Sequence, residues 1–225
     1  MKADLERGTR QRRPRADAVR NRERILAAAR DVFIDEGPNA PLEAIAARAG
    51  VGIATLYRRF PDRRALMHAV VVAGLERAEE EGRLALAEES EPFQALARYL
   101  RRILDLRISA VVPALLGEVA MDDDEMIQLR DRSSRPMQAL IERAHAAGSL
   151  RGDVTFGDIG LLLVRLSRPL PGNFPPALNE ALARRHLALL LDALRPPVRD
   201  RPDPLPAPAL ALDDLREITP SAPPG

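Results

Sequence analysis

Proline and glycine cut the first third of the sequence into short helices, and this punctuation constrains the fold more than any other feature. An apolar stripe with helical spacing runs over 17–36 and stops at a glycine-proline pair. Further short helices are predicted over 42–49 and 53–60, and the tight turn Gly50-Val51-Gly52 separates them. Pro61 ends the last of them. Two short helices joined by a tight glycine turn are typical of a helix-turn-helix unit.

The rest of the chain also has helical periodicity, and no segment shows the alternation of a β-strand. Asp62 is suited to cap a helix, and Thr155 and Asp158 have the spacing of a capping box. We therefore predict an all-α fold. The later helices are expected over 62–86, 91–111, 123–147, 155–167 and 179–194.

Composition excludes several classes of protein. The 225 residues include no cysteine, which excludes disulfides, thiolate metal sites and cysteine nucleophiles. No apolar run approaches the roughly 18 residues that span a bilayer, and the arginine-rich start has no apolar segment of a secretory signal. A soluble cytoplasmic protein is expected. Residues 1–72 carry six more basic than acidic side chains, whereas the remainder carries five more acidic ones, which indicates an anionic partner for the N-terminal part.

The predicted helix over 53–60 carries polar groups suited to nucleic acid. Its apolar residues are spaced to pack on the first helix, which leaves Thr55, Tyr57, Arg58 and Arg59 exposed as donors for phosphates and base edges. Gly50 is predicted to adopt a left-handed conformation in the turn. The next helix starts with Arg63 and Arg64. Cations at a helix start oppose the helix dipole, which destabilises the helix by about a few tenths of a kcal/mol each. A phosphate bound beside them would make their position favourable.

These residues resemble the DNA-binding domain of the TetR family. The resemblance covers about residues 20–80 and is carried by Arg24-Ile25-Leu26, Phe33, Gly37, Ile45-Ala46, Ala49-Gly50-Val51, Thr55-Leu56-Tyr57-Arg58-Arg59-Phe60, Arg63 and Leu66. It implies a homodimeric repressor that places its recognition helices in successive major grooves of a palindromic operator, and that a small-molecule ligand releases. The implied DNA-binding residues are Gly52, Ala54, Thr55, Tyr57, Arg58, Arg59, Arg63 and Arg64. Gly52 stands where the family often has a capping Ser or Thr.

The predicted organisation has four parts. A disordered basic arm (1–16) precedes a helix-turn-helix DNA-binding domain (17–72), whose motif spans about 42–61. A helical regulatory and dimerisation domain (73–195) follows, and a proline-rich disordered tail (196–225) ends the chain.

The resemblance implies that the last two helices form a four-helix dimer interface, and their apolar surface favours the same reading. The expected interface residues are Gly160, Leu161, Leu163, Val164, Leu187, Leu190, Leu191 and Leu194. Few aromatic residues occur beyond residue 72, so an aliphatic, methionine-containing ligand pocket is expected. The candidate pocket residues are Tyr99, Arg102, Met121, Met126, Met137, His145, Phe156 and Arg165.

No metal or other cofactor is expected. The acidic run 122–125 is interpreted as a solvated helix start, since contiguous carboxylates do not converge on one ion. His68, His145 and His186 are too far apart in the sequence for zinc-ligand spacing. No phosphate loop or nucleophile elbow is present. The alternative interpretation is a helical enzyme or scaffold whose N-terminal bundle only resembles a helix-turn-helix. The operator, the regulated genes and the effector are not encoded in any motif.

Overall fold

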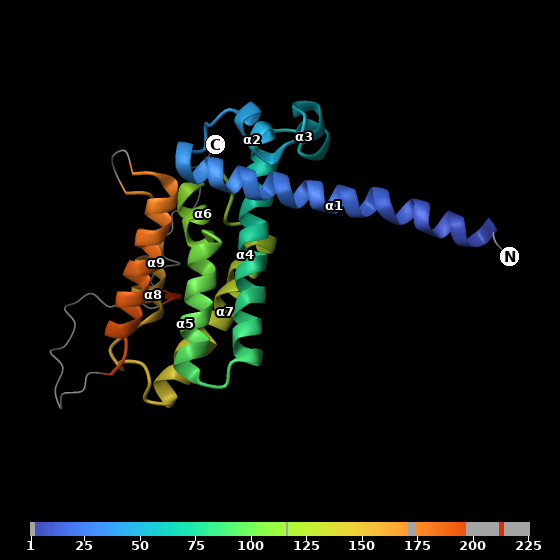
Figure 1. Cartoon of the computed structure of the whole chain (residues 1–225). Coiled ribbons are helices and arrows are strands. Elements are labelled where there is room, and N and C mark those ends of the chain that lie inside the picture. Colours follow the sequence, from blue (N-terminus) through green and yellow to red (C-terminus); the bar gives the residue numbers. More distant parts are fainter. Residues whose placement is uncertain (1–2, 116, 171–173, 197–211, 214–225) are drawn as a thin grey trace.

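The computed structural model describes residues 3–115, 117–170, 174–196 and 212–213. Within them the chain forms helices and no strand, so the predicted all-α fold is confirmed (Figure 1). The helices are α1 (Ala3–Glu36), α2 (Leu42–Ala49), α3 (Ile53–Arg59), α4 (Arg63–Glu88), α5 (Pro92–Asp105), α6 (Ile108–Ala114), α7 (Asp124–Ala146), α8 (Phe156–Leu166) and α9 (Pro176–Ala193).

The helix starts follow the capping signals of the sequence. Asp62 accepts a hydrogen bond from the backbone N–H of Ala65 at 2.7 Å and so caps α4. Thr155 and Asp158 form a complete capping box at the start of α8. Asp123 caps α7 in the same way through the N–H of Met126, which gives one member of the acidic run a structural role. Short polar side chains therefore set these boundaries by satisfying N–H groups that have no partner within the helix.

The first helix is longer than predicted. It begins at Ala3, so residues 3–16 continue α1 as a helix where an irregular arm was expected. Five of the fourteen residues 3–16 are arginine, whose helix propensity is high, whereas Gly8 and Pro14 oppose a helix and no apolar stripe marks one. Figure 1 shows the N-terminal part of α1 projecting away from the rest of the molecule.

The predicted helix over 91–111 is interrupted. The chain turns between α5 and α6 at Arg107, whose φ of 52° and ψ of 26° are left-handed. Such a conformation costs a residue with a side chain about 1–3 kcal/mol, and surrounding contacts must hold it. Arg107 Nη2 donates to Asp35 Oδ1 of α1 at 2.6 Å, a contact that periodicity alone does not predict. The last helix also differs from prediction, since α9 begins at Pro176, where a proline in the first turn is favourable.

Two apolar cores lie one above the other along α4. The first joins α1, α2 and α3 to the first turns of α4, and it also includes Val111 and Leu115 of the α6 region and Met126 and Leu129 of α7. The second core is formed by the later part of α4 with α5, α7, α8 and α9. Because the first core extends into α6 and α7, the predicted boundary at 72/73 does not separate two independent packing units.

The closest crossing of α4 and α7 depends on Gly82. A Cβ added there would lie 2.4 Å from Cβ of Pro136, which sits inside α7, and 3.3 Å from Cε2 of Tyr99. No side chain fits at that distance, so the glycine permits the two helices to pack. A Cβ added at Gly74, about two turns earlier in α4, would lie at an ordinary 3.8 Å from the nearest atom.

Most of the predicted tail over 196–225 lies outside the described residues. Among the helices that the structure does describe, none combines the length and the apolar character required to cross a membrane.

Candidate nucleic-acid interface

Buried apolar side chains fix the position of α3 against the first helix. Leu56 is the one fully buried residue of α3, and it packs in the first core with Ile45 of α2 and Phe33 of α1. Phe60, directly after α3, is also buried there. The opposite face of α3 is left in solvent, and Figure 1 shows α2 and α3 at the end of the molecule furthest from the α4–α5 turn.

The turn between α2 and α3 is held by Gly50 and Arg24. Gly50 has a φ of 63°, which confirms the predicted left-handed conformation. Arg24 Nη2 of α1 donates to the carbonyl oxygens of Ala49 (2.6 Å) and Gly50 (3.4 Å) at the C-terminus of α2. A Cβ on Gly50 would lie 2.5 Å from that nitrogen. The turn therefore needs glycine both for its backbone angle and for the arginine that caps the helix.

The solvent face of α3 presents the side chains expected from the sequence. Ala54, Arg58 and Arg59 are exposed. Tyr57 has 47% of its surface in solvent, although tyrosine side chains are usually more buried than this. Thr55 is half-buried, and its hydroxyl accepts a hydrogen bond from Arg58 Nη2 at 3.3 Å. This face combines cationic, hydroxyl and aromatic groups and lacks acidic ones, which suits phosphates and base edges.

Gly52 occupies the N-cap position of α3 in an extended conformation, with no side-chain cap. The Thr55 N–H of the first turn donates to the carbonyl oxygen of Gly52 at 2.8 Å, so the start of α3 is held by backbone hydrogen bonds.

The two arginines at the start of α4 are held differently. Arg63 Nη1 donates to the carbonyl oxygens of Pro38 (2.9 Å) and Ala40 in the α1–α2 loop, so its half-buried guanidinium already has hydrogen-bond acceptors. The unfavourable position of a cation in the first turn is therefore explained by these carbonyls, where the sequence suggested a phosphate. Arg64 is exposed, and its side chain makes no hydrogen bond or ion pair with the described residues.

The eight residues expected to line a ligand pocket are divided between the two cores and the surface. Met121 and Met126 belong to the first core, whereas Tyr99 and Met137 belong to the second. Burial raises the pKa of the Tyr99 hydroxyl, as expected for a phenol surrounded by apolar groups. Of the other four expected pocket residues, Arg102, His145 and Phe156 are half-buried and Arg165 is exposed. A buried methionine or tyrosine has the same sequence pattern in a core as in a pocket, so a ligand pocket lined by these residues stays a prediction.

Arg102 is a half-exposed arginine that pairs with the buried Glu81 where α4 and α5 meet. Its Nε and Nη2 donate to the two carboxylate oxygens of Glu81 at 3.1 and 3.0 Å, and Arg77 Nη2 lies 2.6 Å from Glu81 Oε1. The hydrogen bonds from Arg102 hold the pKa of Glu81 below its ordinary value, against the opposing effect of burial. His145 Nε2 lies 2.9 Å from the carbonyl oxygen of Arg151, which places it in a turn contact.

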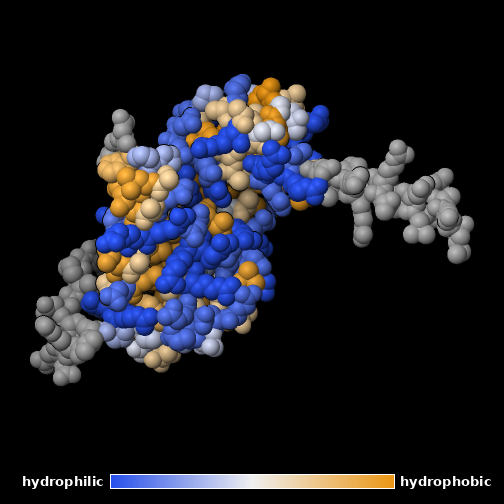
Figure 2. Space-filling model, in the orientation of Figure 1, coloured by the Kyte–Doolittle hydropathy of each residue, from blue (hydrophilic) through white to orange (hydrophobic). Residues whose placement is uncertain are grey.

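The eight predicted interface residues divide into two groups. Leu163, Leu187, Leu191 and Leu194 are buried in the second core and hold α8 and α9 to the rest of the chain. Leu161 is exposed, and Gly160, Val164 and Leu190 are partly exposed. Leu178 and Leu189 were not among the predicted interface residues, yet both are exposed, and Leu189 has 61% of its surface in solvent. Figure 2 shows apolar surface gathered on the side of the molecule formed by α9.

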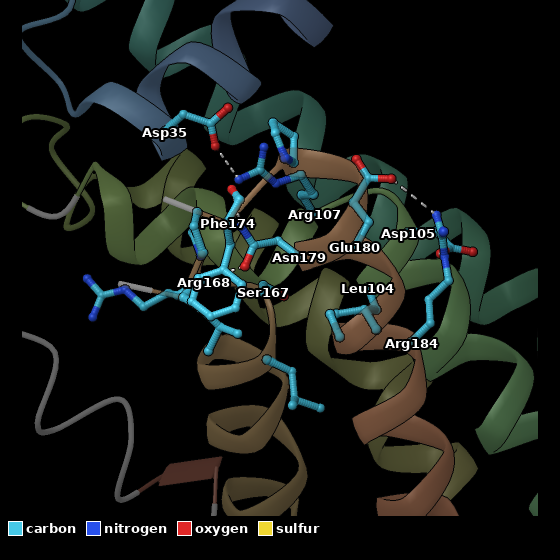
Figure 3. Close-up of a pocket in the computed structure, with 15 residues that line it drawn as sticks. Asp35, Leu104, Asp105, Arg107, Ser167, Arg168, Phe174, Asn179, Glu180 and Arg184 are labelled. Atoms are coloured by element: carbon cyan, nitrogen blue, oxygen red, sulfur yellow. Dashed lines mark hydrogen bonds and ion pairs between the residues drawn. The ribbon is translucent and has the colours of Figure 1, made fainter. Parts of the chain in front are cut away.

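A hollow that the sequence did not indicate lies where the two parts of the chain meet. It has a volume of about 330 Å³ and is bordered by the end of α1, the α5–α6 break, the end of α8 and the start of α9. Figure 3 shows Asp35 bonded to Arg107 at one end, with Arg184 beside Asp105 and Glu180 at the other end. Within the described residues no group of three or more His, Asp or Glu side chains could hold a metal ion.

Comparison with known proteins connects these features. The sequence profile of bacterial regulatory proteins of the tetR family matches residues 25–70, and that of the SbtR-like transcriptional regulator C-terminal domain matches residues 91–196. The crystal structure of the TetR transcriptional regulator SCO0520 from Streptomyces coelicolor is 36% identical, with a TM-score of 0.57 over 78% of this chain and 98% of that one. The chain belongs to the TetR family.

Other TetR relatives support the same assignment. A TetR transcription regulatory protein from Mycobacterium vanbaalenii is 32% identical, with a TM-score of 0.53 over 81% of this chain and 99% of that one. The HTH-type transcriptional regulator SAB2452 of Staphylococcus aureus (strain bovine RF122 / ET3-1) is 41% identical over 58 residues, which is 25% of this chain and 31% of that relative. TetR family proteins are DNA-binding transcriptional regulators and often respond to ligands, so the face of α3 is the candidate DNA-binding surface.

Proposed function

We propose that this TetR family member is a homodimeric repressor that binds a palindromic operator and is released from it by a small molecule. The observation that carries the proposal is the solvent face of α3, where Tyr57, Arg58 and Arg59 are exposed on a helix held by buried Leu56. A helix presented in this way fits the major groove of DNA. The protein would act in the cytoplasm, on double-stranded DNA, without a membrane partner.

The proposed DNA contacts differ in kind along this surface. Tyr57, Arg59 and Arg64 are assigned to phosphates, and Ala54, Thr55 and Arg58 to the base edges. Gly52 has open space where a Cβ would lie, which allows the DNA backbone to approach the start of α3 closely.

The structure changes the role that we propose for Arg63. Because its guanidinium donates to Pro38 and Ala40, Arg63 is a positioning residue that ties the α1–α2 loop to the start of α4. Any contact that it makes with phosphate is secondary. Arg64 is then the residue of the pair that neutralises a phosphate.

We propose that α8 and α9 form the dimer interface through their exposed apolar residues. Leu161, Leu178 and Leu189 are more exposed than large aliphatic side chains usually are, and they lie on these two helices or at their edge. A two-fold dimer places its recognition helices on successive turns of a palindrome, about 34–36 Å apart. A monomer in sedimentation at micromolar concentration would contradict this interface, and Leu189→Asp should dissociate the dimer without unfolding the chain.

The test of DNA binding uses the protein's own promoter region in a gel-shift titration. Tyr57→Ala and Thr55→Ala should each weaken binding, since both change the exposed face of α3 and leave its buried anchor intact. Arg101→Ala, an exposed substitution on α5, is the matched control and should bind as the wild type does. If the two α3 variants keep full affinity, α3 is not the recognition helix.

A further inference from the structure

Two adjoining hollows lie between the N-terminal helices and the rest of the chain. The first, here the corner hollow, has a volume of about 330 Å³ and is bordered by Leu104, Arg107, Leu166, Ala183 and the other residues of Figure 3. The second, here the apolar hollow, has a volume of about 240 Å³. Its walls include Phe33, Ile34, Ala110, Pro113 and Val164. Both are bordered by Arg168 and Pro169, so they form one junction site with a polar and an apolar end. The volumes together fall in the usual range for small-ligand pockets.

Cations outnumber carboxylates on the α1 side of this junction. Asp35 is paired with Arg107 at 2.6 Å and with Arg48 at 3.6 Å, and Asp31 is paired with Arg30 at 3.0 Å. Three arginines therefore share two carboxylates.

Arg168 adds a fourth arginine, and among the described residues it has no ion-pair partner. The acidic residues at the other end, Asp105 and Glu180, are engaged by Arg184 at 2.7 and 3.6 Å. Of the three arginines and three carboxylates that border the two hollows, Arg168 is the one without an ion-pair partner among the described residues.

The donors of Arg107 are only partly used. Its Nη2 donates to Asp35, while its Nη1 lies 4.0 Å from Asp31, too far for a hydrogen bond. A guanidinium has five N–H donors in a fork that matches a carboxylate. Arg168 is exposed, and in Figure 3 its guanidinium points away from the hollow. An exposed arginine changes rotamer within nanoseconds, so it can turn to close on a bound anion.

The geometry points to a binding site for a small amphipathic carboxylate at this junction, with its acid group between Arg107 and Arg168 and its hydrocarbon body in the apolar hollow. The binding site itself does not depend on the proposed function; only the effect of the ligand on operator affinity rests on it. A carboxylate on Arg107 competes with Asp35, and this ion pair joins the α5–α6 break to the end of α1. Ligand binding would thus release the helix that packs on α2 and α3, and operator affinity would fall.

The first experiment measures binding in the absence of DNA. Octanoate is titrated into the full-length protein by calorimetry, with hexanoate and decanoate for chain length and with 1-octanol and octyltrimethylammonium as uncharged and cationic controls. We expect octanoate to bind in the micromolar to low-millimolar range, decanoate to bind more tightly, and the two controls to bind at least about 10-fold more weakly, because they cannot accept charge-assisted hydrogen bonds.

Two exposed arginines, Arg168 and Arg101 of α5, provide a matched pair of variants. Arg168→Ala should weaken octanoate binding about 10-fold, the loss expected for one charge-assisted hydrogen bond. Arg101→Ala removes the same charge at a position that borders neither junction hollow, and it should bind octanoate as the wild type does. Filling the apolar hollow with Ala110→Leu should abolish the dependence on chain length, and circular dichroism confirms that each variant is folded.

The outcomes separate the site from the regulation. If no carboxylate of the series binds, if octanol binds equally well, or if both arginine variants behave alike, the proposed site is wrong. If octanoate binds as expected and operator DNA lowers its affinity by the same factor by which octanoate lowers operator affinity, the coupling is supported. If octanoate binds but operator affinity is unchanged, the coupling through Arg107 is overturned. Failure to bind DNA at all would contradict the proposed function and leave the octanoate result standing.

Discussion

Replacing Arg63 and Arg64 separately should distinguish a residue that holds the fold from one that holds DNA. Arg63 donates from a charged nitrogen to two carbonyl oxygens, and such bonds contribute about 1.5–3 kcal/mol when both groups are fully desolvated. The site is half-buried, so water replaces part of that contribution in Arg63→Ala. Removing a cation from the first turn of α4 returns about 0.3–1 kcal/mol. The net loss in the free energy of unfolding should be about 1–2 kcal/mol.

Urea denaturation followed by circular dichroism measures this difference, with Arg64→Ala as the control. Arg64 is exposed, so its replacement should change stability by less than about 0.5 kcal/mol. In operator titrations at several salt concentrations, Arg64→Ala should reduce the slope of log K against log salt by about 1.8 for the dimer, the contribution of one phosphate per protomer. If Arg63→Ala proves as stable as Arg64→Ala and is the variant that loses the slope, the hydrogen bonds to the loop are not what Arg63 contributes.

Three further predictions concern stability. Gly82→Ala should destabilise by about 1–3 kcal/mol because its methyl group meets α7, whereas Gly74→Ala on the same helix should stabilise by about 0.5–1 kcal/mol, as thermal unfolding of the pair will show. Gly52→Ser supplies the missing cap of α3 with open space around its Cβ, so it should raise the urea midpoint by the equivalent of about 0.5–1 kcal/mol; a lower midpoint would contradict the open cap. The pKa of Glu81 is lowered by Arg102. The Glu81 carboxylate therefore stabilises the folded state fully above its ordinary pKa near 4.5, and this stabilisation is lost as the pH falls below that value. Glu81→Gln should show a smaller loss of stability between neutral and acid pH.

Local signals in the sequence predicted the ends of several helices correctly. Asp62 and Thr155 are caps whose effect is confined to one turn, and Gly50 is required by one backbone angle, so each could be recognised without knowledge of tertiary contacts. The break at Arg107 depends on Asp35, which is 72 residues away in sequence, and no local pattern reports that pair. The hydrogen bonds of Arg63 could not be predicted for the same reason, because its partners are carbonyl groups of another loop and carbonyl groups carry no sequence signal; its contact with phosphate stays a prediction.

The residues of the C-terminal half were harder to assign. A leucine that faces the core and a leucine that faces a partner subunit have the same periodicity, so Leu187 and Leu191 were expected at the interface and are buried within the chain. The junction hollows are formed by residues from α1, α6, α8 and α9, each of which looks ordinary in its own segment. Only the packing of these helices brings Arg107 and Arg168 to the same site.

The most direct test of the central claim is the affinity of the protein for its own promoter DNA, measured by fluorescence anisotropy over a range of salt concentrations beside the double variant Arg58→Ala/Arg59→Ala. The account predicts tight wild-type binding that weakens steeply with salt, and a double variant that loses both affinity and part of the salt slope. Equal binding by the two proteins, or wild-type binding that does not depend on salt, would contradict the assignment of α3 as the DNA-binding surface.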